Sequence, residues 1–91
     1  MKTLSEISFG LPVTTTYSNG KITATLLHGN ETKTRKRVSY NHSLNQGDNH
    51  YAACLAVLEK VKAEEGKDFE VVAYTYSEKG TGYTFTCHRA N

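Results

Sequence analysis

The chain has 91 residues, 11 Lys and Arg against 9 Asp and Glu, and a hydrophobic fraction of 37%. This length has room for one domain over residues 1–91, and it excludes large enzymes and long channels. The low apolar fraction predicts a thin core. A formal net charge of +2 is too small to indicate a nucleic-acid partner by itself.

The first residues contain no apolar run of the kind that signal peptides carry, and no stretch approaches the ~20 apolar residues of a membrane span. We therefore expect a cytoplasmic protein without a membrane partner. The 2 cysteines, Cys54 and Cys87, lie in apolar stretches. We expect two reduced, buried thiols, because small disulfide scaffolds normally carry more cysteines.

Residues 13–28 predict a β-hairpin. Asn19-Gly20 lies at its centre and is the strongest short hairpin signal, since both residues tolerate a positive φ. A two-residue turn fixes the register, which pairs Tyr17 with Ile22, Thr15 with Ala24, and Val13 with Leu26. One face of the hairpin is then mostly apolar and the other is threonine-rich and polar, which is typical of a half-buried sheet.

A third strand is predicted at residues 32–40. Val38 and Tyr40 alternate toward one face, and the opposite face receives Lys33, Arg35, Arg37 and Ser39. If the apolar pair faces the core, these three cations join the threonine face of the hairpin.

Residues 41–48 form a polar loop with the chemistry of a helix start. Ser43 and Gln46 have the spacing of a capping box, and Asn45 or Asp48 could cap instead. The helix is expected to run to about residue 65 and to end at Gly66. Its apolar residues recur at helical spacing: Tyr51, Cys54, Leu55, Val57, Leu58 and Val61.

A second hairpin is predicted from residues 69–77 and 81–88, with residues 78–80 as its loop. The loop chemistry favours a register that pairs Ser77 with Thr81, Thr75 with Tyr83, Ala73 with Phe85, and Val71 with Cys87. That register leaves Tyr74 and Tyr76 on the outer face. A slip of one residue would instead turn both tyrosines inward, beside Tyr83 and Phe85.

The predicted order is therefore β-β-β-α-β-β. For this length we expect an α+β fold with one antiparallel sheet and a single amphipathic helix packed on one face. The other face of the sheet would be open to solvent. The strand order does not follow from the sequence, and an edge strand of so small a sheet could pair between chains in a homodimer.

The sequence carries no nucleophile motif, phosphate-binding loop or zinc-ligand spacing, so we expect no enzyme, no cofactor and no metal site. A small enzyme with His42, Asp48 and His50 near the helix start is the minor alternative. The basic third strand is the more informative feature. We predict a partner-binding surface on the open sheet face, made of Lys33, Arg35, Lys36, Arg37, Tyr74 and Tyr76.

Tyrosine and arginine anchor protein interfaces, and the same residue types stack bases and pair phosphates in single-strand binders. The basic and tyrosine face therefore suits either a protein or a nucleic acid. A plainer interpretation is that Lys and Arg guard an exposed edge strand against aggregation.

The segment Val38-Ser39-Tyr40-Asn41-His42-Ser43-Leu44, followed by Asp48-Asn49-His50-Tyr51-Ala52-Ala53, resembles a pattern in small phage and prophage proteins. There a strand ending in Tyr leads through a short loop into a helix opening N-H-x-x-A, matched here by Asn49 and His50. By size and layout the chain is also similar to anti-CRISPR proteins, which are inhibitors of bacterial defence.

This resemblance implies a non-enzymatic phage accessory protein that binds a host protein or ribonucleoprotein stoichiometrically and blocks it. The alternative is a nucleic-acid-binding module that uses the basic and tyrosine face.

Overall fold

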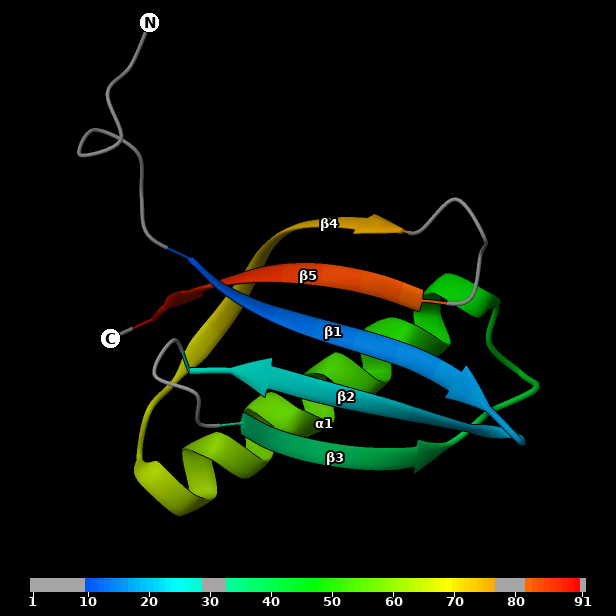
Figure 1. Cartoon of the computed structure of the whole chain (residues 1–91), viewed down its shortest axis with the longest axis horizontal. Coiled ribbons are helices and arrows are strands. Elements are labelled where there is room, and N and C mark those ends of the chain that lie inside the picture. The colour runs from blue at the N-terminus through cyan, green and yellow to red at the C-terminus, as the bar shows by residue number, and fades with distance from the viewer. Residues whose placement is uncertain (1–9, 29–32, 77–81, 91) are drawn as a thin grey trace, which may run out of the picture.

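The structure is a computed structural model that describes residues 10–28, 33–76 and 82–90. The elements follow the order β-β-β-α-β-β, as predicted, and they build an α+β fold with one open antiparallel sheet and one helix (Figure 1). Their bounds are β1 (Leu11–Ser18), β2 (Lys21–Leu27), β3 (Lys33–Ser39), α1 (Gln46–Glu65), β4 (Phe69–Tyr76) and β5 (Gly82–Arg89).

The β1–β2 hairpin has the register that its turn predicts. Asn19 and Gly20 adopt φ values of 52° and 77°, the left-handed region that a two-residue hairpin turn needs. Tyr17 lies opposite Ile22, and the pairing continues from there to Val13 and Leu26. The local turn chemistry therefore decided which threonines face away from the core.

The five strands lie in the order β3-β2-β1-β5-β4, so β3 and β4 are the two edges. The helix packs mainly against β2 and β3, less against β1, and least against β5. In Figure 1 it crosses behind the β1–β3 half of the sheet, and β4 projects beyond it. One face of β1, β2, β3 and much of β5 is thus covered, and Phe69 and Val71 at the start of β4 pack against the same core, while residues 72–76 of β4 are exposed.

Both ends of α1 are capped by residues that the sequence indicated. Asn45 is the N-cap, and its side chain accepts a hydrogen bond of 2.8 Å from the backbone N–H of Asp48. Gly66 adopts φ 70° at the C-terminus, and its N–H donates to the carbonyl of Lys62. Of the alternative caps that the loop offered, Asn45 is the one that the structure uses.

The core lies between α1 and the covered face of the sheet. Its fully or almost fully buried members are Val13, Ile22, Ala24, Leu26, Ala53, Cys54, Val57, Leu58, Val61, Phe85 and Cys87. Both thiols are buried, as predicted. A hydrogen bond to Cys87, together with burial, raises the pKa of the Cys54 thiol. The helical stripe is corrected at two positions, because Tyr51 and Leu55 are exposed.

The β4–β5 hairpin contains the main departure from the predicted register. Val71 lies opposite Cys87, as expected, but an irregularity between Val71 and Ala73 shifts the rest of β4 by one residue. Beyond this bulge Tyr74 lies opposite Phe85 and Tyr76 opposite Tyr83. The slipped register is therefore the correct one for the second half of β4, and the predicted loop at residues 78–80 lies outside the described residues.

Candidate functional site

The sheet face that points away from α1 carries aligned rows of polar side chains. The strand registers place Arg35 beside Thr25, and that row continues through Thr14, Thr84 and Thr75 across the whole sheet. A second row runs from Arg37 through Thr23 and Thr16 to Gly82. We call this surface the threonine face: it comprises these two rows together with Lys33, Lys21 and Ser39.

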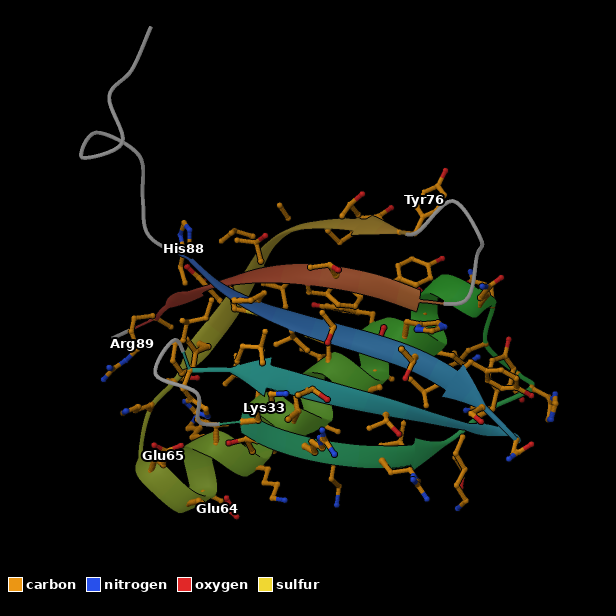
Figure 2. All side chains as sticks on the ribbon, in the orientation of Figure 1. Lys33, Glu64, Glu65, Tyr76, His88 and Arg89 are labelled. Carbon is orange, nitrogen blue, oxygen red and sulfur yellow. The ribbon has the colours of Figure 1, made fainter. Side chains whose placement is uncertain are left out.

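The acidic side chains of the described residues are concentrated on the helix, which also carries Lys60 and Lys62, and are scarce on the sheet. Within the described strands the only acidic residue is Glu70. It lies on the edge strand β4, opposite His88 of β5. The helix, by contrast, carries Asp48, Glu59, Glu64 and Glu65. Figure 2 labels Lys33 at the start of β3, at the opposite edge of the sheet from Tyr76. Among the described residues, the threonine face therefore offers cations and hydroxyls, with Glu70 as its single carboxylate.

The cations of the threonine face are not neutralised by ion pairs between described residues. The ion pairs of the described chain join Glu65 to His28 and Lys67, and Asp68 to Lys62. Arg35 is contacted instead through its backbone, whose carbonyl oxygen accepts a 2.9 Å hydrogen bond from Lys60 Nζ. The guanidinium groups of Arg35 and Arg37 are thus exposed and available to an external anion.

The structure divides the predicted partner-binding set between two faces. Lys33, Arg35 and Arg37 lie on the threonine face, whereas Lys36 lies opposite the buried Ala24 and so belongs to the helix side. Placing Tyr74 and Tyr76 beside these cations was wrong. The bulge turns both rings to the helix side, because that position sets them against Phe85 and Tyr83 instead of against threonines.

A groove of about 440 Å³ opens on the helix side, where β4 projects beyond α1. Its aromatic lining comes from Tyr51, Tyr74, Tyr83 and Phe85, with ring centroids 6.0 Å apart for Tyr51 and Phe85 and 6.1 Å for Tyr74 and Phe85. Tyr74 and Tyr76 are each 65% exposed. This aromatic groove and the threonine face are separate surfaces on opposite sides of one sheet.

Asn49, whose role the sequence left open, holds the loop that joins β3 to α1. Its side-chain oxygen accepts a 2.7 Å hydrogen bond from the N–H of Asn41. Its amide nitrogen lies 2.9, 3.2 and 3.0 Å from the carbonyl oxygens of Asn41, Leu44 and Asn45. The buried amide thus supplies the loop with backbone-like partners, and this structural task accounts for an asparagine at this position.

His50 is a buried core residue. Its Nδ1 lies 2.7 Å from Thr15 Oγ1, and its ring lies 4.6 Å from the ring of Tyr83. Burial lowers the pKa of His50 below its ordinary value, because the charged form loses its solvation. Its Nε2 is buried without a hydrogen-bond partner in the described chain.

The three candidate catalytic side chains turn to different neighbours. His42 contacts the ring of Tyr40, while Asp48 lines the aromatic groove and His50 bonds to Thr15. Within the described ranges, no group of three or more His, Cys, Asp or Glu side chains is arranged to hold a metal ion. No helix of the described chain is long and apolar enough to cross a membrane.

Two residues of the threonine face were not predicted from the sequence. Thr75 was assigned to the core side of β4, and only the bulge turns it outward. Gly82 carried no signal of its own, but a Cβ there would stand 2.6 Å from the carbonyl oxygen of Thr15. A shallow hollow of about 300 Å³ lies beside Gly82 on this face, bordered by Thr14, Thr16, Thr75 and Thr84, and Tyr76 and Tyr83 are also among its lining residues.

Comparison of the chain with protein-family models, with curated proteins and with solved structures found no similar protein.

Proposed function

We propose that this protein is a non-enzymatic binding protein whose threonine face docks on the phosphate backbone of a nucleic acid, either free or within a ribonucleoprotein. The observation that carries the proposal is the segregation of charge. Cations and hydroxyl groups share one exposed sheet face, and the acidic side chains of the described residues lie on the helix, which also carries Lys60 and Lys62, in the segment after it at Asp68, or on the edge strand β4 at Glu70.

The residue types on this face match the chemistry of phosphate. A guanidinium group offers paired N–H donors to phosphate oxygens, and threonine hydroxyls donate to the same oxygens. Arg35 and Arg37 lie on one strand, each at the end of a row of hydroxyls or small residues. Backbone contacts of this kind position a protein on a nucleic acid without reading its sequence.

The separation of the tyrosines changes the kind of contact that we propose. Base stacking on Tyr74 and Tyr76 would need these rings beside the cations, and they lie on the other side of the sheet. We therefore favour electrostatic and hydroxyl contacts to the backbone over a stacking platform for single strands.

The test is the salt dependence of binding to fluorescent single- and double-stranded oligonucleotides. If about three cations displace counterions from a duplex, affinity should fall roughly 40-fold as salt rises from about 50 to about 200 mM. Arg37→Glu should weaken binding about tenfold or more and flatten this slope. Lys36→Glu is the matched control, because it makes the same charge change one residue away on the opposite face.

Two results would refute the proposal. One is the absence of binding to every probe at low salt. The other is an equal loss of affinity in Arg37→Glu and Lys36→Glu, which would show that net charge matters and the face does not.

The wider biological role that we propose is the one implied by the resemblance to phage accessory proteins. In this role the protein occupies the nucleic-acid path of a bacterial defence ribonucleoprotein and blocks it stoichiometrically. A phage-restriction assay in cells that express the protein tests this separately. Protection of the phage by the wild type and its loss in Arg37→Glu support the role, and unchanged restriction with the wild type contradicts it.

A further inference from the structure

The two edges of the sheet differ in how they are protected. The β3 edge bears Lys33, Arg35, Lys36 and Arg37, and Lys60 donates to the carbonyl oxygen of Arg35. Charged side chains and covered backbone groups are the usual means by which an edge strand avoids pairing with another chain. The β3 edge is therefore guarded.

The β4 edge has little of this protection. Its sequence is FEVVAYTY, with Glu70 as its single charge and no proline. Phe69 and Val71 pack against the core, but Val72 is 48% exposed and residues 73–76 are exposed as well. The bulge interrupts the edge before Ala73, so residues 73–76 form a regular free edge of β-prone side chains. No hydrogen bond between described residues occupies the outer side of this segment.

The sequence of this free edge is symmetric about its centre. Tyr74-Thr75-Tyr76 reads the same in both directions. When two copies of such a segment run antiparallel about a twofold axis at Thr75, each Tyr74 lies opposite a Tyr76, and the two Thr75 residues face each other. Aromatic pairs and threonine pairs are among the favourable cross-strand neighbours of antiparallel sheets.

We propose that two copies of this chain pair through their β4 edges, antiparallel and with the twofold axis at Thr75. The occupant is a second copy because the edge complements itself. The existing cross-strand neighbours continue into the partner: Tyr76 already lies beside Tyr83, with ring centroids 5.9 Å apart, and Tyr74 lies 6.1 Å from Phe85. Each ring pair of one copy is thereby extended by a tyrosine of the other.

The charges are compatible with this arrangement. The two copies of Glu70 lie at opposite ends of the paired segment, so the antiparallel alignment avoids the like-charge contact that a parallel, in-register alignment would create. Pairing of this kind is isologous, so it closes at a dimer and leaves the guarded β3 edges at the two outer ends. The inference uses β4 alone and does not depend on what the threonine face binds.

Sedimentation equilibrium of the full chain gives the first test. The wild type should approach twice the monomer mass of 10.1 kDa at high micromolar concentration. Thr75→Lys places two like charges against each other at the axis and should return the mass to that of a monomer. Thr84→Lys is the control, since Thr84 is the neighbour of Thr75 on the next strand and lies away from the edge.

Cross-linking locates the interface and remains informative if Thr75→Lys fails to fold. Thr75→Cys should be joined to its symmetry mate by a short bis-maleimide cross-linker, because directly opposite Cβ atoms in an antiparallel pair lie about 4.5–5.5 Å apart. Ser39→Cys on the β3 edge should not cross-link. A wild type that stays monomeric, a dimer that Thr75→Lys leaves intact, or a dimer in which Thr75→Cys does not cross-link would each overturn the inference.

Discussion

Replacement of Asn49 by aspartate should destabilise the protein more than its replacement by alanine. The side-chain amide accepts one hydrogen bond from the N–H of Asn41 and directs its nitrogen at three loop carbonyl oxygens. Because an amide nitrogen has two hydrogens, these three contacts amount to about two full donor bonds. Asn49→Ala therefore removes about three hydrogen bonds, each with a net contribution of about 1 kcal/mol.

Asn49→Asp keeps the acceptor but turns a carboxylate oxygen toward the loop carbonyls. The lost donors cost about 2 kcal/mol, and the unpaired, partly desolvated charge adds about 1–3 kcal/mol. Its position in the first turns of α1 returns about 0.3–1 kcal/mol through the helix dipole, which is too little to compensate. These terms sum to a loss of about 2–5 kcal/mol for the aspartate variant, with a centre of about 3.5 kcal/mol, against about 3 kcal/mol for alanine.

Urea unfolding followed by circular dichroism measures both losses, each against the wild type at the same pH. At low pH the protonated carboxyl group can donate one hydrogen bond, so the gap between the two variants should narrow. Asp48→Asn, an exposed neighbour in the same turn, is the control and should change stability by less than about 0.5 kcal/mol. If Asn49→Asp is as stable as the wild type at neutral pH, the loop does not depend on the amide donors.

Three further outcomes test the packing and the electrostatics of the core. The lowered pKa of His50 means that the unfolded chain binds the proton more readily, so the free energy of unfolding should fall as pH drops through about 6.5. His50→Gln should reduce this pH dependence of the free energy of unfolding in a series of urea titrations. A pH dependence equal to that of the wild type contradicts a buried neutral ring. Gly82→Ala should cost about 1–3 kcal/mol, because its Cβ would meet a backbone carbonyl oxygen at 2.6 Å. Gly47→Ala is the control and should unfold near the wild-type temperature, since the nearest atom to its Cβ outside the helix backbone is a side-chain oxygen at 3.4 Å. Equal thermal unfolding midpoints for the two variants would refute the close approach at Gly82. Val57→Ala, in the buried face of α1, should lower the free energy of unfolding in urea by about 2 kcal/mol, and Val72→Ala, on the exposed edge, by less than about 0.5 kcal/mol. The reverse order would contradict the packing of these two residues.

The sequence predicted the elements whose geometry depends on neighbouring residues. The positive φ that Asn19 and Gly20 tolerate sets the turn and hence the register of the first hairpin. The alternation of Val38 with Arg37 likewise placed Lys33, Arg35 and Arg37 on the threonine face. Gly66 ended the helix as expected. In each case the deciding interaction spans only a few residues.

The helix shows where local pattern fails. Its apolar stripe predicted Tyr51 and Leu55 as core residues, but both are exposed, while the polar Asn49 and His50 are buried. The reason is tertiary: α1 lies over β1–β3 and leaves the side toward β4 open. The β3–α1 loop supplies hydrogen bonds to the Asn49 amide and Thr15 supplies one to His50 Nδ1, while His50 Nε2 has no partner in the described chain.

The amino-acid sequence by itself determined the hairpins, the helix and the gathering of cations and threonines on one face, because alternation and turn chemistry act between close neighbours. Only the tertiary structure decided the strand order and the side of the sheet on which Tyr74 and Tyr76 lie. The alternation of inward and outward side chains along a strand does not predict where a bulge interrupts it. The extra residue at Val72 lets the rings of Tyr74 and Tyr76 lie beside those of Phe85 and Tyr83. These contacts exist only once β5 lies beside β4.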